Sequence, residues 1–256
     1  MDIHRERGLL LRQLKNYLIF LRETGATRVP LQSELHRFPI MKPPITHAHE
    51  HMVVSNQGPS KKEASDSTLK KPELLKAVQE ELGECTRCKL CEGRQNIVFG
   101  SGNPNADIVF VGEGPGADED AQGLPFVGRA GKKLTEIIEK GMKLDREKDT
   151  YICNIVKCRP PGNRDPEKDE IEACKPFLIE QLRAIRPKVI VALGKPAAST
   201  LLGRNVPITK ERGTWHEFEG FKLMLTFHPA YLLRAYTLEN RRAVMDDMNM
   251  VLEALK

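Results

Sequence analysis

The fold is decided by one stretch of the sequence, Asp107-Ile108-Val109-Phe110-Val111-Gly112-Glu113-Gly114-Pro115-Gly116. The stretch begins as a short run of apolar, largely β-branched residues and passes directly into a glycine-rich loop. A continuous apolar run of this length is typical of a strand that is buried on both faces, as the strands of a parallel sheet are. We therefore predict a central strand over residues 107–112.

Three further apolar runs share this character, and helical patterns separate them. The strands are predicted at 150–156, 188–194 and 222–227, and the helices at 130–142, 166–185, 196–202 and 238–255. Alternating strands and helices predict a mostly parallel sheet, because parallel neighbours need a crossover connection and the crossover helices cover both faces. The predicted fold class is therefore α/β, with a sheet between two helix layers (α/β/α).

The first 72 residues differ from the rest of the chain. Apolar residues spaced four, three and four apart line one helical face: Leu10, Leu14, Tyr17 and Leu21. We predict an amphipathic helical extension over 1–40, a flexible linker rich in Pro, Ser, Lys and Glu over 41–72, and one domain over 73–256. The helix could dock a protein partner, pair with itself or cover its own domain, and the sequence does not choose among these.

The composition argues against a membrane protein. Of the residues, 40% are hydrophobic and 29% are charged, and no stretch approaches the roughly 20 uninterrupted apolar residues of a membrane span. The most apolar segment, 9–21, is interrupted by Arg12 and Lys15, and no cleavage site of a secretory signal follows it. We expect a monomeric, cytoplasmic protein without a membrane partner. Its formal net charge of +5 fits a polyanionic partner but does not establish one.

Unusual side chains follow the predicted strands. Ligands of an open parallel sheet bind beyond the carboxyl ends of its strands. There the first strand leads to Glu113, the second holds Asn154 among apolar neighbours, and the fourth ends at His228. A tight turn between strand and helix would explain the glycines of the first loop but not Glu113. Asn154 and His228 do have structural interpretations, as a buried amide satisfied by backbone and as a histidine that caps a helix. A carboxylate, an amide and an imidazole at one edge together favour a functional site.

The six cysteines all lie between Cys85 and Cys174. Four of them form two pairs: Cys85 with Cys88, and Cys158 with Cys174. Two pairs of thiolates suit a tetrahedral zinc ion or an iron–sulfur cluster, and disulfides are improbable in a cytosolic chain. Cys153 is next to Asn154 in a strand, so it faces the opposite side and is interpreted as a small buried hydrophobe. Cys91 stays an alternative ligand.

Six motifs follow one another along the chain. They are Cys85-x-x-Cys88, Gly112-Glu113-Gly114-Pro115-Gly116, Pro125-Phe126-Val127-Gly128, Asn154-x-x-Lys157-Cys158-Arg159-Pro160-Pro161-Gly162-Asn163-Arg164, Cys174-Lys175-Pro176 and His228-Pro229-Ala230. Their order and spacing resemble family 4 uracil-DNA glycosylases, the type that carries a [4Fe-4S] cluster. The resemblance runs from about Leu82 to the C-terminus and does not cover the first 80 residues.

The resemblance implies a fold and an activity. The fold is a four-stranded parallel sheet between helix layers. The activity is hydrolysis of the N-glycosidic bond of uracil in single- and double-stranded DNA, which initiates base excision repair. Gly114 stands where the family usually has alanine, and the loss of one methyl group should be tolerated. A related branch that links covalently to DNA carries a basic insertion ending in histidine; this chain has none, which implies the hydrolytic branch.

The resemblance also implies roles for the strand-end residues. The uracil pocket would be formed by Gly112, Glu113, Gly114, Phe126, Asn154 and His228. In it Phe126 stacks on the extruded base, Asn154 bonds uracil O4 and N3–H, and His228 faces O2. Catalysis would rest on Asn154, His228 and Glu113. For Glu113 we expect that it positions or activates the attacking water, or offsets positive charge on the sugar.

DNA contacts and the metal centre are implied in the same way. The segment Tyr231-Leu232-Leu233-Arg234 resembles one that enters the minor groove with an apolar wedge, and Tyr231, Leu232 and Arg234 are expected to contact DNA. The same leucines could be buried in the first turn of a helix, and one could point outward while the other packs. Arg159 and Arg164 are expected to contact phosphates. The cluster ligands would be Cys85, Cys88, Cys158 and Cys174. Such a cluster would be structural, because Cys158 lies four residues beyond Asn154 and would fix the loop 159–164.

Two other functions compete with this interpretation. One is a catalytically silent DNA- or RNA-binding module with a structural metal, which would release no uracil from a labelled oligonucleotide. The other is a zinc-containing nucleotide hydrolase, which would lack the brown colour of an iron–sulfur protein.

Overall fold

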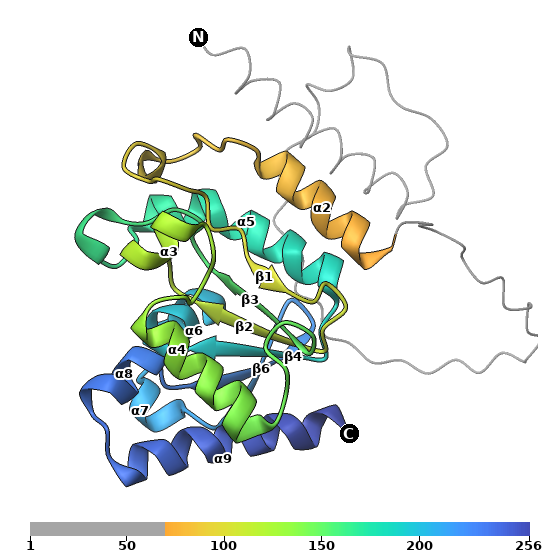
Figure 1. Ribbon diagram of the computed structural model, residues 1–256, viewed down its shortest axis with the longest axis vertical. Helices are drawn as coiled ribbons and strands as arrows, with labels where there is room; N and C mark the ends of the chain where they lie inside the picture. The colour runs from red at the N-terminus through yellow and green to blue at the C-terminus, as the bar shows by residue number, and fades with distance from the viewer. Residues whose placement is uncertain (1–69) are drawn as a thin grey trace, which may run out of the picture. The chain divides into compact units, whose positions relative to one another are not determined.

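The computed structural model describes residues 70–256, which Figure 1 draws in colour. The expected extension over 1–40 lies outside the described residues, and so does the expected linker up to residue 69. Lys71 already begins helix α2 (Lys71–Leu82), with Pro72 in its first turn, where the missing N–H of proline costs no hydrogen bond. None of the helices within residues 70–256 has the length and apolar character needed to cross a membrane.

The centre of the fold is a parallel sheet. Four strands lie in the order β3-β2-β4-β6 and run in parallel. Their bounds are β2 (Ile108–Gly112), β3 (Thr150–Asn154), β4 (Val189–Leu193) and β6 (Phe221–Thr226). Each overlaps a predicted strand, and the first three are buried along their whole length. The α/β class predicted from continuous apolar runs is thus confirmed.

The sheet is mixed, which corrects the expectation of four parallel strands. Two edge strands extend it to six: β1 (Ser101–Gly102) pairs antiparallel with β3, and β5 (Trp215–Phe218) pairs antiparallel with β6. Glu219 and Gly220, both at positive φ, form the tight turn between β5 and β6. Edge strands are half exposed and show no continuous apolar run, so the pattern that revealed the central strands could not reveal these.

Helices cover both faces of the sheet (Figure 1). Alternate residues of β2 point to opposite sides. Val109 and Val111 pack in one buried cluster with residues of α2, α5 (Lys168–Ile185) and α6 (Gly194–Leu202). Ile108 and Phe110 pack in a second cluster with residues of α4 (Arg129–Glu136), α8 (Pro229–Arg234) and α9 (Leu238–Leu255). These two clusters are the cores of a three-layer arrangement.

The helices follow the predictions closely. Helix α9 has the predicted bounds, and α4 continues into the π-helical segment η3 (Ile137–Met142). Helix α5 begins after Glu167, whose backbone N–H donates to the Glu170 carboxylate at 2.7 Å, so the chain at Pro166 is still outside the helix. The remaining short elements are η2 (Lys89–Cys91), α3 (Ala117–Gln122), η4 (Pro161–Asn163) and α7 (Ile208–Glu211).

Candidate active site

The strand-end residues meet at one edge of the sheet. Gly112 ends β2 and Asn154 ends β3, and the two are partners in the parallel register. His228 follows β6 by two residues and is the N-cap of α8. The common direction of the parallel strands therefore brings together three positions that are far apart in the sequence.

Gly112 lies where two side chains converge. A Cβ atom added to Gly112 would stand 2.3 Å from Asn154 Oδ1 and 2.6 Å from two carbon atoms of the Phe126 ring. No real Cβ tolerates such contacts, so only glycine lets the amide and the ring approach the backbone of β2. Phe126 and Asn154 thus border one small space at the end of the strand.

Asn154 has an amide oxygen without a partner. The side chain is 1% exposed, and within residues 70–256 its Oδ1 accepts no hydrogen bond. An unpaired buried acceptor costs about 1–3 kcal/mol, which a ligand that supplies a donor would offset. The structure therefore does not support the purely structural interpretation, in which the backbone would satisfy the buried Asn154 amide. The buried Lys157 fixes the backbone of Asn154, because its Nζ donates a hydrogen bond to the Asn154 carbonyl oxygen at 2.6 Å.

Phe126 is held in an unusual conformation. Its φ of 54° lies in the left-handed region, which non-glycine residues rarely adopt. Two contacts fix it: Gly131 packs directly on the Phe126 carbonyl, and Glu119 accepts hydrogen bonds from the next two amides, Val127 and Gly128, at 2.9 Å each. Strain of this kind persists only where surrounding structure enforces it, often at functional sites. Glu119, whose role the sequence did not reveal, thus fixes the Phe126 loop.

His228 is neutral at physiological pH. Its Nδ1 accepts a hydrogen bond from the Ala230 amide at 3.1 Å, which places the ring proton on Nε2. Burial, helped by the positive charge of Arg234, lowers the pKa of His228 to about 4. Its ring centroid lies 5.8 Å from that of Phe126. The imidazole therefore offers one N–H donor beside the aromatic ring.

Glu113 carries a carboxyl group with a high proton affinity. Burial, together with the nearby Asp165 carboxylate, raises its pKa to about 7, and its Oε1 has no hydrogen-bond partner among residues 70–256. Glu113 lines a cavity of about 550 Å³ that extends along helices α5 and α6. Phe126, Asn154 and His228 do not line this cavity. The cavity that Glu113 lines is therefore distinct from the space beside Gly112.

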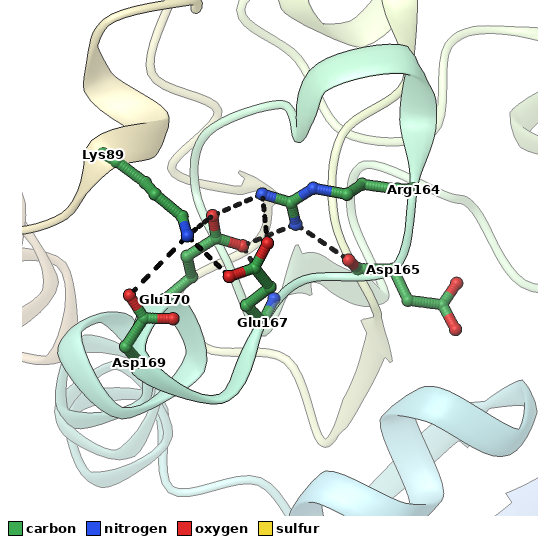
Figure 2. Close-up of polar contacts among 6 residues, drawn as sticks. All are labelled: Lys89, Arg164, Asp165, Glu167, Asp169 and Glu170. Atoms are coloured by element: carbon green, nitrogen blue, oxygen red, sulfur yellow. Dashed lines mark hydrogen bonds and ion pairs between the residues drawn. The ribbon is translucent and has the colours of Figure 1, made fainter.

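Arg164, an expected phosphate ligand, forms ion pairs with carboxylates. Its two terminal nitrogens donate to the two oxygens of Glu170 at 2.8 and 2.6 Å (Figure 2). The Glu170 side chain is fully buried, and Lys89 lies 3.8 Å from it. A buried carboxylate needs this compensation, so Arg164 stabilises the start of α5. Arg159 differs, since only its Nε is used, in a bond of 2.7 Å to Asn163 Oδ1.

Helix α8 exposes Leu233 and buries Leu232, so Leu233, and not the expected DNA contact Leu232, is placed to serve as the apolar wedge. Leu232 is 3% exposed and belongs to the core against α4 and α9, whereas Leu233 is 43% exposed. Consecutive helical residues point about 100° apart, so only one of the two can face the core. The Tyr231 ring packs at a tilt of 40° against the Phe227 ring, with the ring centroids 4.7 Å apart, and Arg234 is exposed.

The cysteines line a second, much smaller cavity. Its walls contain Cys85, Cys88, Cys91, Cys158 and Cys174. Cys153 is fully buried elsewhere, as predicted, and none of the six is in a disulfide. Cys91, left open as a ligand by the sequence, thus belongs to the same wall. Burial raises the pKa of the Cys174 thiol to about 11, so an occupant must supply positive charge to draw off its proton.

The donor set of this cavity fits an iron–sulfur cluster. No three His, Cys, Asp or Glu side chains within residues 70–256 are close enough to share a single metal ion. The thiols instead surround a volume, and N–H groups point at them. Arg87 donates to Cys85 at 3.4 Å, Arg94 to Cys158 at 3.3 Å and the Lys157 amide to Cys174 at 3.3 Å. Thiolate ligands with hydrogen bonds to sulfur are the environment of iron–sulfur clusters.

Comparison with known proteins gives consistent matches. The family model described as "Uracil DNA glycosylase superfamily" matches residues 99–253. The type-4 uracil-DNA glycosylase of Thermotoga maritima is 49% identical over 187 residues, which cover 72% of this chain and 96% of that protein. The type-4 enzyme of Saccharolobus solfataricus is 45% identical over 71% of this chain and 86% of its own. A type-5 uracil-DNA glycosylase of Pyrobaculum aerophilum is 31% identical over 51% of this chain and 64% of its own.

Proposed function

This chain belongs to the type-4 uracil-DNA glycosylases of the uracil-DNA glycosylase superfamily, and we propose that its strand-end side chains divide the work of uracil removal among them. The enzyme hydrolyses the N-glycosyl bond between uracil and deoxyribose, the first step in base excision repair. The observation that carries the division of roles is the unpaired Asn154 amide oxygen beside the Phe126 ring and the neutral His228.

Recognition of uracil rests on Asn154. Its Oδ1 accepts from uracil N3–H, and its Nδ2 donates to O4. Cytosine offers an amine and a bare N3 in these positions, which reverses both bonds. A polar site left unpaired by the wrong substrate can discriminate by about 10⁴–10⁵. Phe126 stacks on the face of the base, which replaces the neighbours lost when the nucleotide leaves the duplex.

His228 stabilises the departing base. When the bond between C1′ and N1 breaks, its electron pair moves into uracil and negative charge accumulates on O2. The His228 Nε2–H donates to O2, and this hydrogen bond strengthens as the charge develops. Because the imidazole is neutral, it acts by donating a hydrogen bond and remains neutral through the step.

Glu113 receives a proton from the attacking water. The water oxygen forms a bond to C1′, and one water proton passes to the Glu113 carboxylate. The products are the uracil anion and an abasic deoxyribose with a hydroxyl group on C1′. A base is most effective when its pKa lies near the working pH, and the Glu113 pKa of about 7 meets this condition.

DNA approaches this edge of the sheet through α8 and the loop after β3. Leu233, exposed on α8, fills the space that the extruded uracil leaves in the duplex. Arg234 and the terminal nitrogens of Arg159 contact phosphates. Unstacking a base costs a few kcal/mol, least in single strands and mismatches, so both single-stranded DNA and G·U pairs are good substrates.

The cysteine cavity holds a [4Fe-4S] cluster. Cys85, Cys88, Cys158 and Cys174 would be its ligands, with Cys91 as a fifth thiol on the same wall. A cluster held by these thiols would supply structural crosslinks, because the four cysteines come from the segment after α2, the loop after β3 and helix α5. The chain's own contribution is to hold the loop 159–164, which follows Cys158 directly, against the start of α5.

The test is release of free uracil from labelled single- and double-stranded oligonucleotides. Wild-type protein should release it, and Asn154→Ala and His228→Ala should each lower the single-turnover rate by about 10²-fold or more. His216→Ala is a matched control, because this histidine lies on the outer strand β5, where its ring bonds the hydroxyl group of Thr214. Wild-type release with undiminished rates in both site variants would contradict the proposed roles. No release from either substrate would favour a silent nucleic-acid-binding module.

A further inference from the structure

Lys157 is a buried lysine whose side chain contacts neutral acceptors. The residue is 1% exposed, although lysine is rarely buried without a charged partner. Its Nζ donates two hydrogen bonds of 2.6 Å each, one to the Asn154 carbonyl oxygen and one to Gln181 Oε1. Both acceptors are uncharged, so they offset the cost of burying an ammonium group only in part. A methionine would fill a similar space without this cost, so packing alone does not account for the lysine.

Gln181 gives the Lys157 ammonium group a fixed anchor on helix α5. The Gln181 side chain is fully buried, and its Nε2 donates to the Phe99 carbonyl oxygen at 2.9 Å and to the Tyr151 hydroxyl oxygen at 3.4 Å. Because these bonds use the amide nitrogen, the amide oxygen is left to accept from Lys157. The helix thus holds Nζ on one side while the end of β3 holds it on the other.

Lys157 also belongs to the wall of the cysteine cavity. Its backbone N–H donates to Cys174 Sγ at 3.3 Å, and Cys158 follows it directly in the chain. Thiols must lose their protons to ligate a metal, so a cluster in this cavity would place negative charge on this side of the lysine. One residue therefore contacts a cysteine through its backbone and Asn154 through its side chain.

The Asn154 amide has little room for error. Its Oδ1 would stand 2.3 Å from a Cβ atom added to Gly112, so the amide lies directly against the backbone of β2. The direction of a side chain follows its own backbone, so a shift of the Asn154 carbonyl would move the amide as well. A misplacement of about 1 Å can cost about 10²-fold in a positioned group. The hydrogen bond from Lys157 acts on this backbone.

We propose that Lys157 is a positioning residue for uracil recognition, which ties the Asn154 backbone to helix α5 and to the wall of the cysteine cavity. The inference rests on the role proposed for Asn154. By holding the Asn154 carbonyl oxygen, Lys157 sets the direction in which the amide meets the base. Lys157 itself touches no part of the substrate. Its loss should therefore weaken the contact with uracil and leave the contacts with the rest of the DNA intact.

The experiment measures the affinity of the full chain for two DNA duplexes. One contains 2′-fluoro-2′-deoxyuridine, which resists hydrolysis because fluorine disfavours positive charge on the sugar, and the other contains a tetrahydrofuran abasic site without a base. Lys157→Met should weaken binding of the uracil duplex by about tenfold or more and leave abasic binding and iron per chain unchanged. The matched control is Tyr151→Phe, which removes a hydroxyl group at the far end of the same network; it should bind both duplexes like wild type.

Two variants of Gln181 decide the question if Lys157→Met loses iron or stability. Gln181→Met and Gln181→Glu both lose the nitrogen that donates to Phe99, but only glutamate keeps an acceptor for Lys157. Gln181→Met should therefore weaken binding of the uracil duplex, and Gln181→Glu should bind it nearly as well as wild type. Equal affinities of these two variants for the uracil duplex would overturn the inference.

Lys157→Met with wild-type affinity for both duplexes would also overturn it. A parallel loss on both duplexes, with iron retained, would do the same, because that result marks a general structural role. Asn154→Ala separates the two levels of the argument. If it binds the uracil duplex like wild type, the role proposed for Asn154 fails. If it loses this affinity while Lys157→Met and Gln181→Met keep it, only the role of Lys157 fails.

Discussion

Gly194 lies directly against His228: a Cβ atom added to Gly194 would stand 2.7 Å from the His228 Cβ. Gly194 follows β4 at the start of α6, with a φ of +87° that favours glycine. The neighbouring parallel strand therefore ends in a residue without a side chain, and this leaves room for the histidine that follows β6. The position of the imidazole depends on a residue from a different strand.

We therefore expect Gly194→Ala to displace His228 and to lower uracil release by about 10²-fold, the loss typical of one misplaced donor to a developing anion. Gly220→Ala is the matched control, because Gly220 also has a positive φ, +82°, but nothing lies within 4 Å of an added Cβ. The control should lose about 1 kcal/mol of stability and keep its activity. Equal activity of the two variants in single-turnover assays would contradict the importance of this contact.

Glu113→Gln should stabilise the protein in a pH-dependent way. The pKa of Glu113 is raised from its ordinary 4.5 to about 7, so the folded state binds a proton more tightly than the unfolded chain. Stability is therefore lost as the pH rises from 4.5 through 7, by on the order of 2 kcal/mol for a partly buried group. Glu113→Gln has no ionisable group at this position, so the stability of the variant does not fall for this reason as the pH rises. Urea unfolding should show a stability gain at pH 8 and none at pH 4; a gain of equal size at both would contradict the assignment.

The cysteine cavity predicts which thiols hold iron. Serine in place of Cys85, Cys88, Cys158 or Cys174 should remove bound iron and the visible absorption of the purified protein. Cys91→Ser should keep both, and so should Cys153→Ala, whose thiol lies in the core outside the cavity. The measurement is iron per chain together with the absorption spectrum. If Cys91→Ser lost its iron while the serine variant of one of the four proposed ligands kept it, Cys91 would replace that cysteine in the ligand set.

The two leucines of α8 predict opposite effects. Leu232→Ala removes a buried side chain from the core and should cost about 2–5 kcal/mol of stability. Leu233→Ala should leave stability nearly unchanged and slow uracil release from duplex DNA more than from single strands, because only the duplex needs the gap filled. Chemical unfolding and parallel assays on both substrates distinguish them. A stable Leu232→Ala variant with a defect confined to duplex DNA would reverse the assignment.

Much of the fold was predictable because buried strands and helices leave recognisable patterns of apolar residues in the sequence. The central strands are buried on both faces and read as apolar runs, and the last helix has the predicted bounds. Edge strands β1 and β5 carry no such record, since one side of each meets solvent. The linear pattern also could not tell Leu232 from Leu233, because two adjacent leucines look alike until a helix is rotated against its neighbours.

The sequence by itself determined the α/β class, the family motifs and the placement of Glu113, Asn154 and His228 at one edge, because parallel strands share a direction and their carboxyl ends must meet. Only the tertiary structure decided what those residues touch. Arg164 turned out to bind Glu170, and Glu119 turned out to fix the loop that carries Phe126. The sequence separations of the residues that form these contacts follow no helical or strand periodicity. They are fixed by how the loops pack, which no local pattern records.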